Sequence, residues 1–118
     1  MDKKNLTEEK AFALADQNQR KRNLQAAKNL YKETLNTNPD HVESYNNLGV
    51  ILIQLGKLQE AKSSYQKAIQ INPSYASAHN NLGVVFKELG ELQKAANSCQ
   101  KAIQINPNYI SAHNNLAA

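Results

Sequence analysis

The chain has 118 residues, enough for one compact domain or one short array of repeats. Its formal net charge of +4 falls well short of a nucleic-acid-binding tail, and its 4 glycines and 3 prolines are too few for a turn-rich all-β fold. Its 1 cysteine excludes an internal disulfide and fits a reducing compartment. The sequence has neither the apolar run of a signal peptide nor about 18 consecutive apolar residues for a membrane span, so we expect a soluble, mainly helical, cytoplasmic protein.

The sequence repeats with a period of 34 residues. Residues 42–75 and 76–109 are identical at 20 of 34 positions, and the prolines and glycines recur at the same spacing. We therefore divide the chain into a lead-in and four copies, of which the first is divergent and the fourth is only begun. These segments are 1–7, 8–41, 42–75, 76–109 and 110–118.

Apolar residues within each copy follow helical spacing. Tyr45, Leu48 and Leu52 lie on one face of a first helix, and Leu58 begins a similar pattern in a second helix. The pattern predicts helices at 8–21, 24–37, 42–55, 58–71, 76–89, 92–105 and 110–118. Glycines 56 and 90 are expected to end first helices in the left-handed conformation, and the residues after the prolines, Asp40, Ser74 and Asn108, are expected to be N-caps.

Five positions of the period carry a resemblance to a known family. They hold leucine at position 7, a small residue at 8, alanine at 20, tyrosine at 24 and proline at 32. In this pattern residues 8–118 resemble the tetratricopeptide repeat family. The departures are Asn18, Arg22 and Thr34 in the first copy, and Cys99 in place of the aromatic residue in the third. The resemblance implies an all-α, right-handed superhelical solenoid of antiparallel helix pairs, with a concave groove lined by the first helices.

A helical projection leaves one face of each first helix available for a ligand. Consecutive asparagines recur on this face, although asparagine is a mediocre helix former, and each carboxamide carries both a donor and an acceptor. We predict a peptide-binding groove made of Asn46, Asn47, Val50, Ile53, Asn80, Asn81, Val84, Lys87, Asn114 and Asn115.

The segment H-N-N-L-G is similar to the arrays of the O-linked N-acetylglucosamine transferases and related bacterial proteins. That resemblance implies that the asparagines at position 6, here Asn47, Asn81 and Asn115, hold the main chain of a substrate. The first copy departs, with Ala13 at this position. A structural interpretation stays open beside it, in which these asparagines bond only to neighbouring helices and water.

The remaining chemically active residues predict no catalysis. His79 and His113 are in register but lack partners at metal-ligand spacing, so we interpret them as packing residues. Cys99 is expected to be buried and inert, and the run from Arg20 to Arg22 to be a solvated helix end. We predict no catalytic residue, no metal and no cofactor.

The sequence favours a module for protein–protein interaction that binds an extended peptide or protein segment in the concave groove. A substrate-recruiting fragment of a larger transferase-type enzyme is the alternative. RNA binding ranks last, because among groove residues of the second and third copies only Lys87 is basic, against Glu43 and Glu88. We expect no nucleic-acid or membrane partner. For the last segment, 110–118, we expect either fraying or head-to-tail self-association through the uncapped C-terminal end.

One subtype of the family clamps the acidic C-terminal tails of heat-shock chaperones with lysine, arginine and asparagine at fixed positions. Only Asn47 matches that set, and Asp16 stands where the clamp has an asparagine. We therefore expect this chain not to be a chaperone-tail clamp.

Overall fold

The computed structural model describes residues 7–117, which form seven α-helices and no strand. Every predicted helix is confirmed to within one residue at each end. Residues 1–6 of the predicted lead-in, and residue 118, lie outside the described range. The helices are α1 (Glu8–Arg20), α2 (Leu24–Thr37), α3 (Val42–Gln54), α4 (Leu58–Ile71), α5 (Ala76–Glu88), α6 (Leu92–Ile105) and α7 (Ile110–Ala117).

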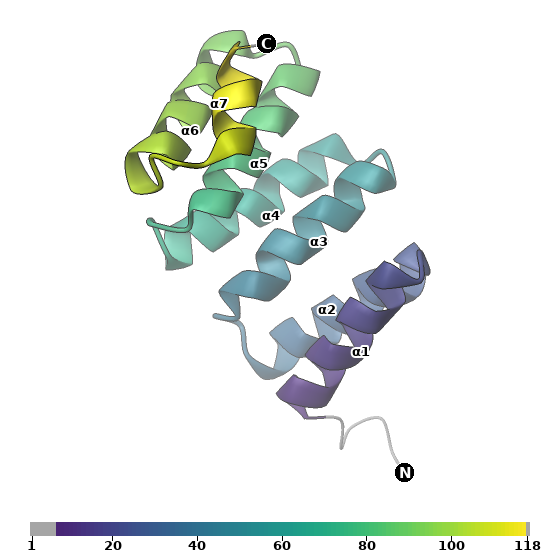
Figure 1. Cartoon of the computed structure of the whole chain (residues 1–118). Helices are drawn as coiled ribbons and strands as arrows, with labels where there is room; N and C mark the ends of the chain where they lie inside the picture. The colour runs from purple at the N-terminus through teal and green to yellow at the C-terminus, as the bar shows by residue number, and fades with distance from the viewer. Residues whose placement is uncertain (1–6, 118) are drawn as a thin grey trace.

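The helices stack as successive pairs along one direction. Within a pair, α1 packs on α2, α3 on α4 and α5 on α6, and each second helix also packs on the first helix of the next pair. Figure 1 shows the stack running from α1 and α2 near the N-terminus to α7 near the C-terminus, and its extents are 50 × 25 × 21 Å. This arrangement confirms the predicted all-α solenoid. Among the described residues, no helix combines the length and apolar character that crossing a membrane requires.

The turn inside each pair has the same geometry. In the second pair the amide of Gly56 donates to the carbonyl of Ile53 and that of Lys57 to the carbonyl of Leu52, which is the Schellman arrangement. Gly56 and Gly90 have φ angles of 77° and 80°, so the predicted left-handed ends are confirmed. Arg22 occupies the same turn of the first pair with φ of 67°, a conformation that L-residues adopt only with strain.

The predicted N-caps are wrong by one residue. The residue before each proline, such as Asn72, accepts the amide proton of the residue after the proline, such as Ser74, over 3.1 Å. Because of this local Asx turn, Ser74 belongs to the turn between α4 and α5, and the N-cap residue of α5 is Tyr75. At α3 the cap is His41, whose Nδ1 accepts from the amide of Ser44 at 3.2 Å.

Position 8 is small because the side chain at position 24 of the same pair packs directly against it. A Cβ added to Gly49 would lie 2.5 Å from Cε1 of Tyr65, and one added to Gly83 would lie 2.7 Å from Sγ of Cys99. The two helices of a pair thus approach closely around a buried side chain, Tyr65 in the second pair and Cys99 in the third. Between pairs, Ile51 and Val85 are fully buried.

Candidate functional site

The candidate site is a row of position-6 asparagines along the first helices. Asn47 on α3, Asn81 on α5 and Asn115 on α7 are each half-buried, one per helix pair. Half-buried Val50, Ile53 and Val84 lie on the same helices, with exposed Lys87. We call this set the asparagine face. Its members are Asn47, Val50, Ile53, Asn81, Val84, Lys87 and Asn115.

Hydrogen bonds between pairs hold two of these asparagines. Nδ2 of Asn81 donates to Oδ1 of Asn46 at 3.2 Å, and Nδ2 of Asn115 donates to Oδ1 of Asn80 at 2.9 Å. Each bond joins residues 35 apart, because position 6 of one copy meets position 5 of the copy before it. The double asparagine therefore links neighbouring pairs.

The placement of the position-5 residues corrects the sequence interpretation. Asn46 is 6% exposed and Asn80 is 4% exposed, so neither side chain is available on an open groove. The next pair covers both, and Nδ2 of Asn46 also donates to Oγ of Ser77 at 3.3 Å. Asn114, at the same position on α7, is exposed because no described helix packs over it.

The inter-pair bonds orient the position-6 carboxamides. An asparagine side chain has two N–H donors and one oxygen acceptor. The bond to Asn46 engages one N–H of Asn81, which leaves its oxygen and its second N–H for another partner. The same holds for Asn115 through its bond to Asn80. Asn46 and Asn80 are thus positioning residues for the asparagine face.

Asn47 is held differently, because position 5 of the first copy is Phe12. It lies near the hydroxyl of Tyr31, which donates to Oε1 of Gln19 at 2.6 Å. Burial raises the pKa of Tyr31 to about 12, and the hydrogen bond involving Asn47 acts in the opposite direction. Tyr31 is therefore a neutral hydrogen-bonding group at any pH the fold normally meets.

A pocket of about 190 Å³ adjoins the C-terminal part of the asparagine face. It brings together three predicted site residues, Val84, Lys87 and Asn115, with Cys99 and Leu92 among its other lining groups. Cys99 is 2% exposed, and burial raises the pKa of its thiol. The expectation that Cys99 is buried is confirmed, and a raised pKa disfavours the reactive thiolate.

The two histidines in register make local structural contacts. Nε2 of His79 lies 2.9 Å from the carbonyl oxygen of Pro73, and Nε2 of His113 lies 2.8 Å from that of Pro107. Each ring thus ties a first helix to the turn that precedes it. Within residues 7–117, no three side chains of His, Cys, Asp and Glu gather as metal ligands would. Arg20 pairs with Asp16 at 2.8 Å across one exposed turn of α1.

Family models match most of the chain between them. One described as TPR repeat matches residues 51–90, and two described as tetratricopeptide repeat match residues 30–63 and 76–109. These matches, with the 34-residue period and the stacked helix pairs, place the chain in the tetratricopeptide repeat family. No curated protein matches it.

Solved structures share the fold. MamA is 27% identical with a TM-score of 0.89, and the match covers 94% of this chain and 65% of MamA. The first tetratricopeptide domain of Spaghetti, bound to an HSP90 peptide, is 20% identical with a TM-score of 0.91, and the match covers 94% of this chain and 88% of that domain. An O-GlcNAc transferase of Thermobaculum terrenum is 26% identical with a TM-score of 0.88, and the match covers 98% of this chain but only 22% of the enzyme.

Proposed function

We propose that this chain is a protein-interaction module that holds an extended protein segment along the asparagine face. The observation that carries the proposal is the orientation of Asn81 and Asn115 by buried asparagines of the preceding pair. A carboxamide held in this way offers a donor and an acceptor without losing further conformational freedom. An extended main chain presents the matching groups whatever its side chains are.

The neighbouring side chains suit a segment of mixed sequence. Val50, Ile53 and Val84 offer partly exposed apolar surface beside the asparagines, and the 190 Å³ pocket next to Asn115 can take a side chain. Apolar contacts of this kind add affinity in proportion to buried area, with little selectivity. Since Lys87 is the only charged member of the face, binding should depend weakly on salt.

The test starts from a segment selected on the intact chain from a library of random peptides. Replacing both Asn47 and Asn81 with alanine removes two contacts worth about 0.5–1.5 kcal/mol each, so binding should weaken about 5- to 150-fold. Titration calorimetry measures the loss, and the far-ultraviolet dichroism spectrum should stay helical.

Asn29→Ala serves as the matched control, because Asn29 is exposed on the second helix α2. That variant should bind like the parent chain. If the double variant folds and binds the selected segment as tightly as the parent, the segment is held elsewhere. If the double variant unfolds, the asparagines act only as structural links between helix pairs.

The similarity to the Thermobaculum terrenum O-GlcNAc transferase favours a second candidate, in which such a face recruits substrate for a catalytic domain. The present chain spans 22% of that enzyme. The genomic reading frame around these residues tests this candidate, because a transferase domain in the same frame would support it and a frame without one would refute it.

A further inference from the structure

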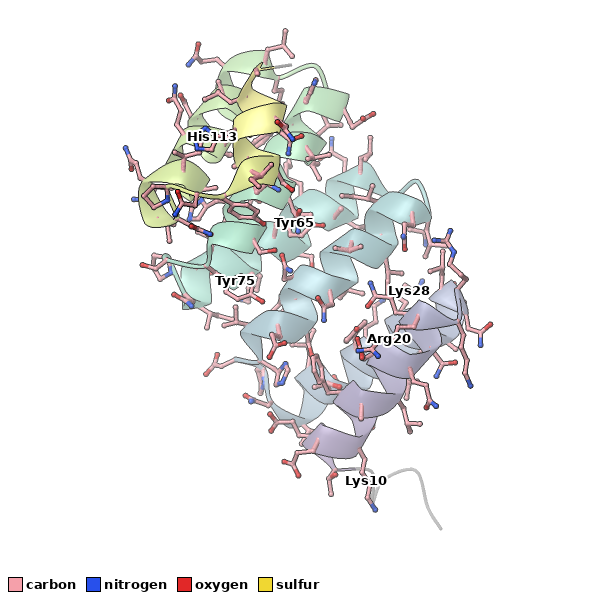
Figure 2. The ribbon with its side chains drawn as sticks, in the orientation of Figure 1. Lys10, Arg20, Lys28, Tyr65, Tyr75 and His113 are labelled. Carbon is pink, nitrogen blue, oxygen red and sulfur yellow. The ribbon has the colours of Figure 1, made fainter. Side chains whose placement is uncertain are left out.

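Position 24 of the repeat, on the second helix of each pair, holds a tyrosine in the first two pairs and a cysteine in the third. Tyr31 on α2 and Tyr65 on α4 (Figure 2) are fully buried, so each ring fills a space inside the stack. Cys99 on α6 has no ring to place there. The third pair therefore carries a much smaller side chain where the other two pairs bury an aromatic ring.

The contacts of the two tyrosines define the space that such a ring takes. Cε1 and Cζ of Tyr65 lie closest to the point where a Cβ on Gly49 would stand, so the ring crosses position 8 of the first helix. The hydroxyl of Tyr31 donates to Oε1 of Gln19, at position 12, over 2.6 Å, and Asn47, at position 6 of the next pair, lies near it. A tyrosine at position 24 thus runs from position 8 to the neighbourhood of position 12 and the next position 6.

The pocket of about 190 Å³ is lined by the same positions in the third pair. Gly83 is at position 8, Lys87 at position 12 and Asn115 at position 6 of the next pair, and Cys99 itself is at position 24. The remaining lining residues are leucines, alanines and a valine. We call this space the position-24 pocket. It corresponds to the site of a tyrosine side chain in the first two pairs.

We propose that the position-24 pocket takes a tyrosine side chain of the segment held on the asparagine face, an inference that rests on the function proposed above. Val84, Lys87 and Asn115 belong both to that face and to the pocket lining, so the two surfaces are continuous. A cavity of about 150 Å³ in a protein core holds benzene. The position-24 pocket, at about 190 Å³, therefore has room for a phenol ring.

The polar groups at the pocket favour tyrosine over phenylalanine. The ammonium of Lys87 is a donor only, and Asn115 keeps its oxygen and one N–H after its bond to Asn80. A phenol hydroxyl can accept from Lys87 and donate to Oδ1 of Asn115, much as the hydroxyl of Tyr31 donates to a carboxamide oxygen. A phenyl ring would make neither bond, so we expect tyrosine to bind about 2- to 12-fold more tightly, the range for one hydrogen bond.

The probe is para-cresol, the side chain of tyrosine without its backbone, titrated into the intact isotope-labelled chain and followed by amide chemical shifts. The shifts should saturate at residues that line the pocket, such as Gly83, Ala95 and Asn115. Toluene, which lacks the hydroxyl, should bind about 2- to 12-fold more weakly at the same residues. Shifts that do not saturate there, or equal affinities for the two probes, would overturn the proposal.

Cys99→Tyr fills the pocket with the ring that the repeat itself uses. The variant should stay folded, because Gly83 offers the same glycine on which Tyr65 packs in the second pair. It should abolish the para-cresol shifts, whereas Cys99→Ser, the matched control without a ring, should bind para-cresol as the parent does. If a folded Cys99→Tyr variant binds para-cresol like the parent, the ring lies elsewhere and the proposal fails.

Lys87→Met tests the same pocket without adding a ring. It keeps an unbranched apolar stem and removes the ammonium, so the preference for para-cresol over toluene should decrease. An unchanged preference would refute the selection of tyrosine through Lys87.

Selection of peptides separates this inference from the function on which it rests. Segments selected on the parent from the random library should be enriched in tyrosine, and segments selected on Cys99→Tyr should not. Segments that lose affinity in Asn47→Ala/Asn81→Ala but show no such enrichment would refute the pocket and leave the asparagine face standing. Saturable para-cresol binding, with no loss of segment affinity in Asn47→Ala/Asn81→Ala, would refute the asparagine face instead.

A second copy of the chain is the other occupant that the test identifies. If the mass of the parent rises with concentration, and Cys99→Tyr alone abolishes that rise, the pocket serves a contact between copies. That result would overturn the proposal.

Discussion

Tyr31 and Tyr65 occupy the same position in successive helix pairs, but their hydroxyl groups differ in partners. The hydroxyl of Tyr31 donates to Gln19, whereas that of Tyr65 is buried and has no hydrogen-bond partner among residues 7–117. The reason lies at position 12 of the repeat, on the first helix of the pair, where Ile53 stands in the second pair in place of Gln19. A buried hydroxyl without a partner carries a desolvation cost that a bonded one avoids.

We therefore expect opposite results from the same substitution at the two tyrosines. Tyr65→Phe removes an unpartnered hydroxyl and should raise the free energy of unfolding by about 1 kcal/mol. Tyr31→Phe breaks the bond to Gln19 and should lower it by about 0.5–1.5 kcal/mol. Urea denaturation at neutral pH measures both changes, and a loss of stability in Tyr65→Phe would show that its hydroxyl is satisfied.

The same variant has a signature at alkaline pH. Burial raises the pKa of Tyr65 above its ordinary value of 10.0, so the folded chain keeps a proton that the unfolded chain releases. The contribution of the protonated Tyr65 to the free energy of unfolding is therefore fully present below pH 10.0 and is lost as the pH rises above that value. Tyr65→Phe should lose less stability than the parent between neutral pH and about pH 11, since it lacks this titrating group.

At the scale of the element, the turn between α1 and α2 is the strained member of its series. Arg22 adopts a φ of 67° where the other two turns have glycine. The left-handed conformation costs an L-residue roughly 1–2 kcal/mol. Glycine removes this cost but also makes the unfolded chain more flexible, so the net gain in stability is smaller. Arg22 is exposed and forms no ion pair among the described residues, so its replacement loses little else.

Arg22→Gly should accordingly stabilise the fold by about 0.5–1 kcal/mol. Gly56→Ala provides the reverse experiment, because a Cβ there would meet no atom within 4 Å and only the backbone conformation opposes it. That variant should lose about 1 kcal/mol. Thermal unfolding followed by circular dichroism compares the two, and unchanged stability in both would show that the turns relax freely.

Helices and turns were predictable from the sequence because the signals that define them are local and recur in each copy. The Asx turns were missed because Asn72 and Ser74 are both good capping residues, and only the backbone path decides which of them bonds. The burial of Asn46 was missed for another reason. It depends on how the next pair packs against α3, and a projection of a single helix contains no information on that packing.

At the scale of the whole molecule, apolar side chains are buried in the interior of the stack but exposed at the end formed by α6 and α7. Leu48 and Leu82, at position 7 of their copies, are each 7% exposed, whereas Leu116 at the same position is 38% exposed. Leu92 and Ile110 are 66% and 73% exposed. At the other end, Leu14 on α1 is 40% exposed. Both ends of the described stack, residues 7–117, thus present apolar side chains, and those at position 7 are buried in its interior.

Head-to-tail self-association stays a prediction, which these surfaces support because each end of the stack can cover the other in a heterologous contact. We expect the mass from light scattering of the 118-residue chain to rise with concentration. Leu92→Glu should abolish the rise by placing a charge on the exposed surface at the α6–α7 end.

Leu14→Glu then determines the geometry of the contact between chains. A head-to-tail contact uses the α1 end and should be lost in this variant, whereas a symmetric dimer through the α6–α7 ends should persist. A mass equal to the monomer at every concentration would refute self-association.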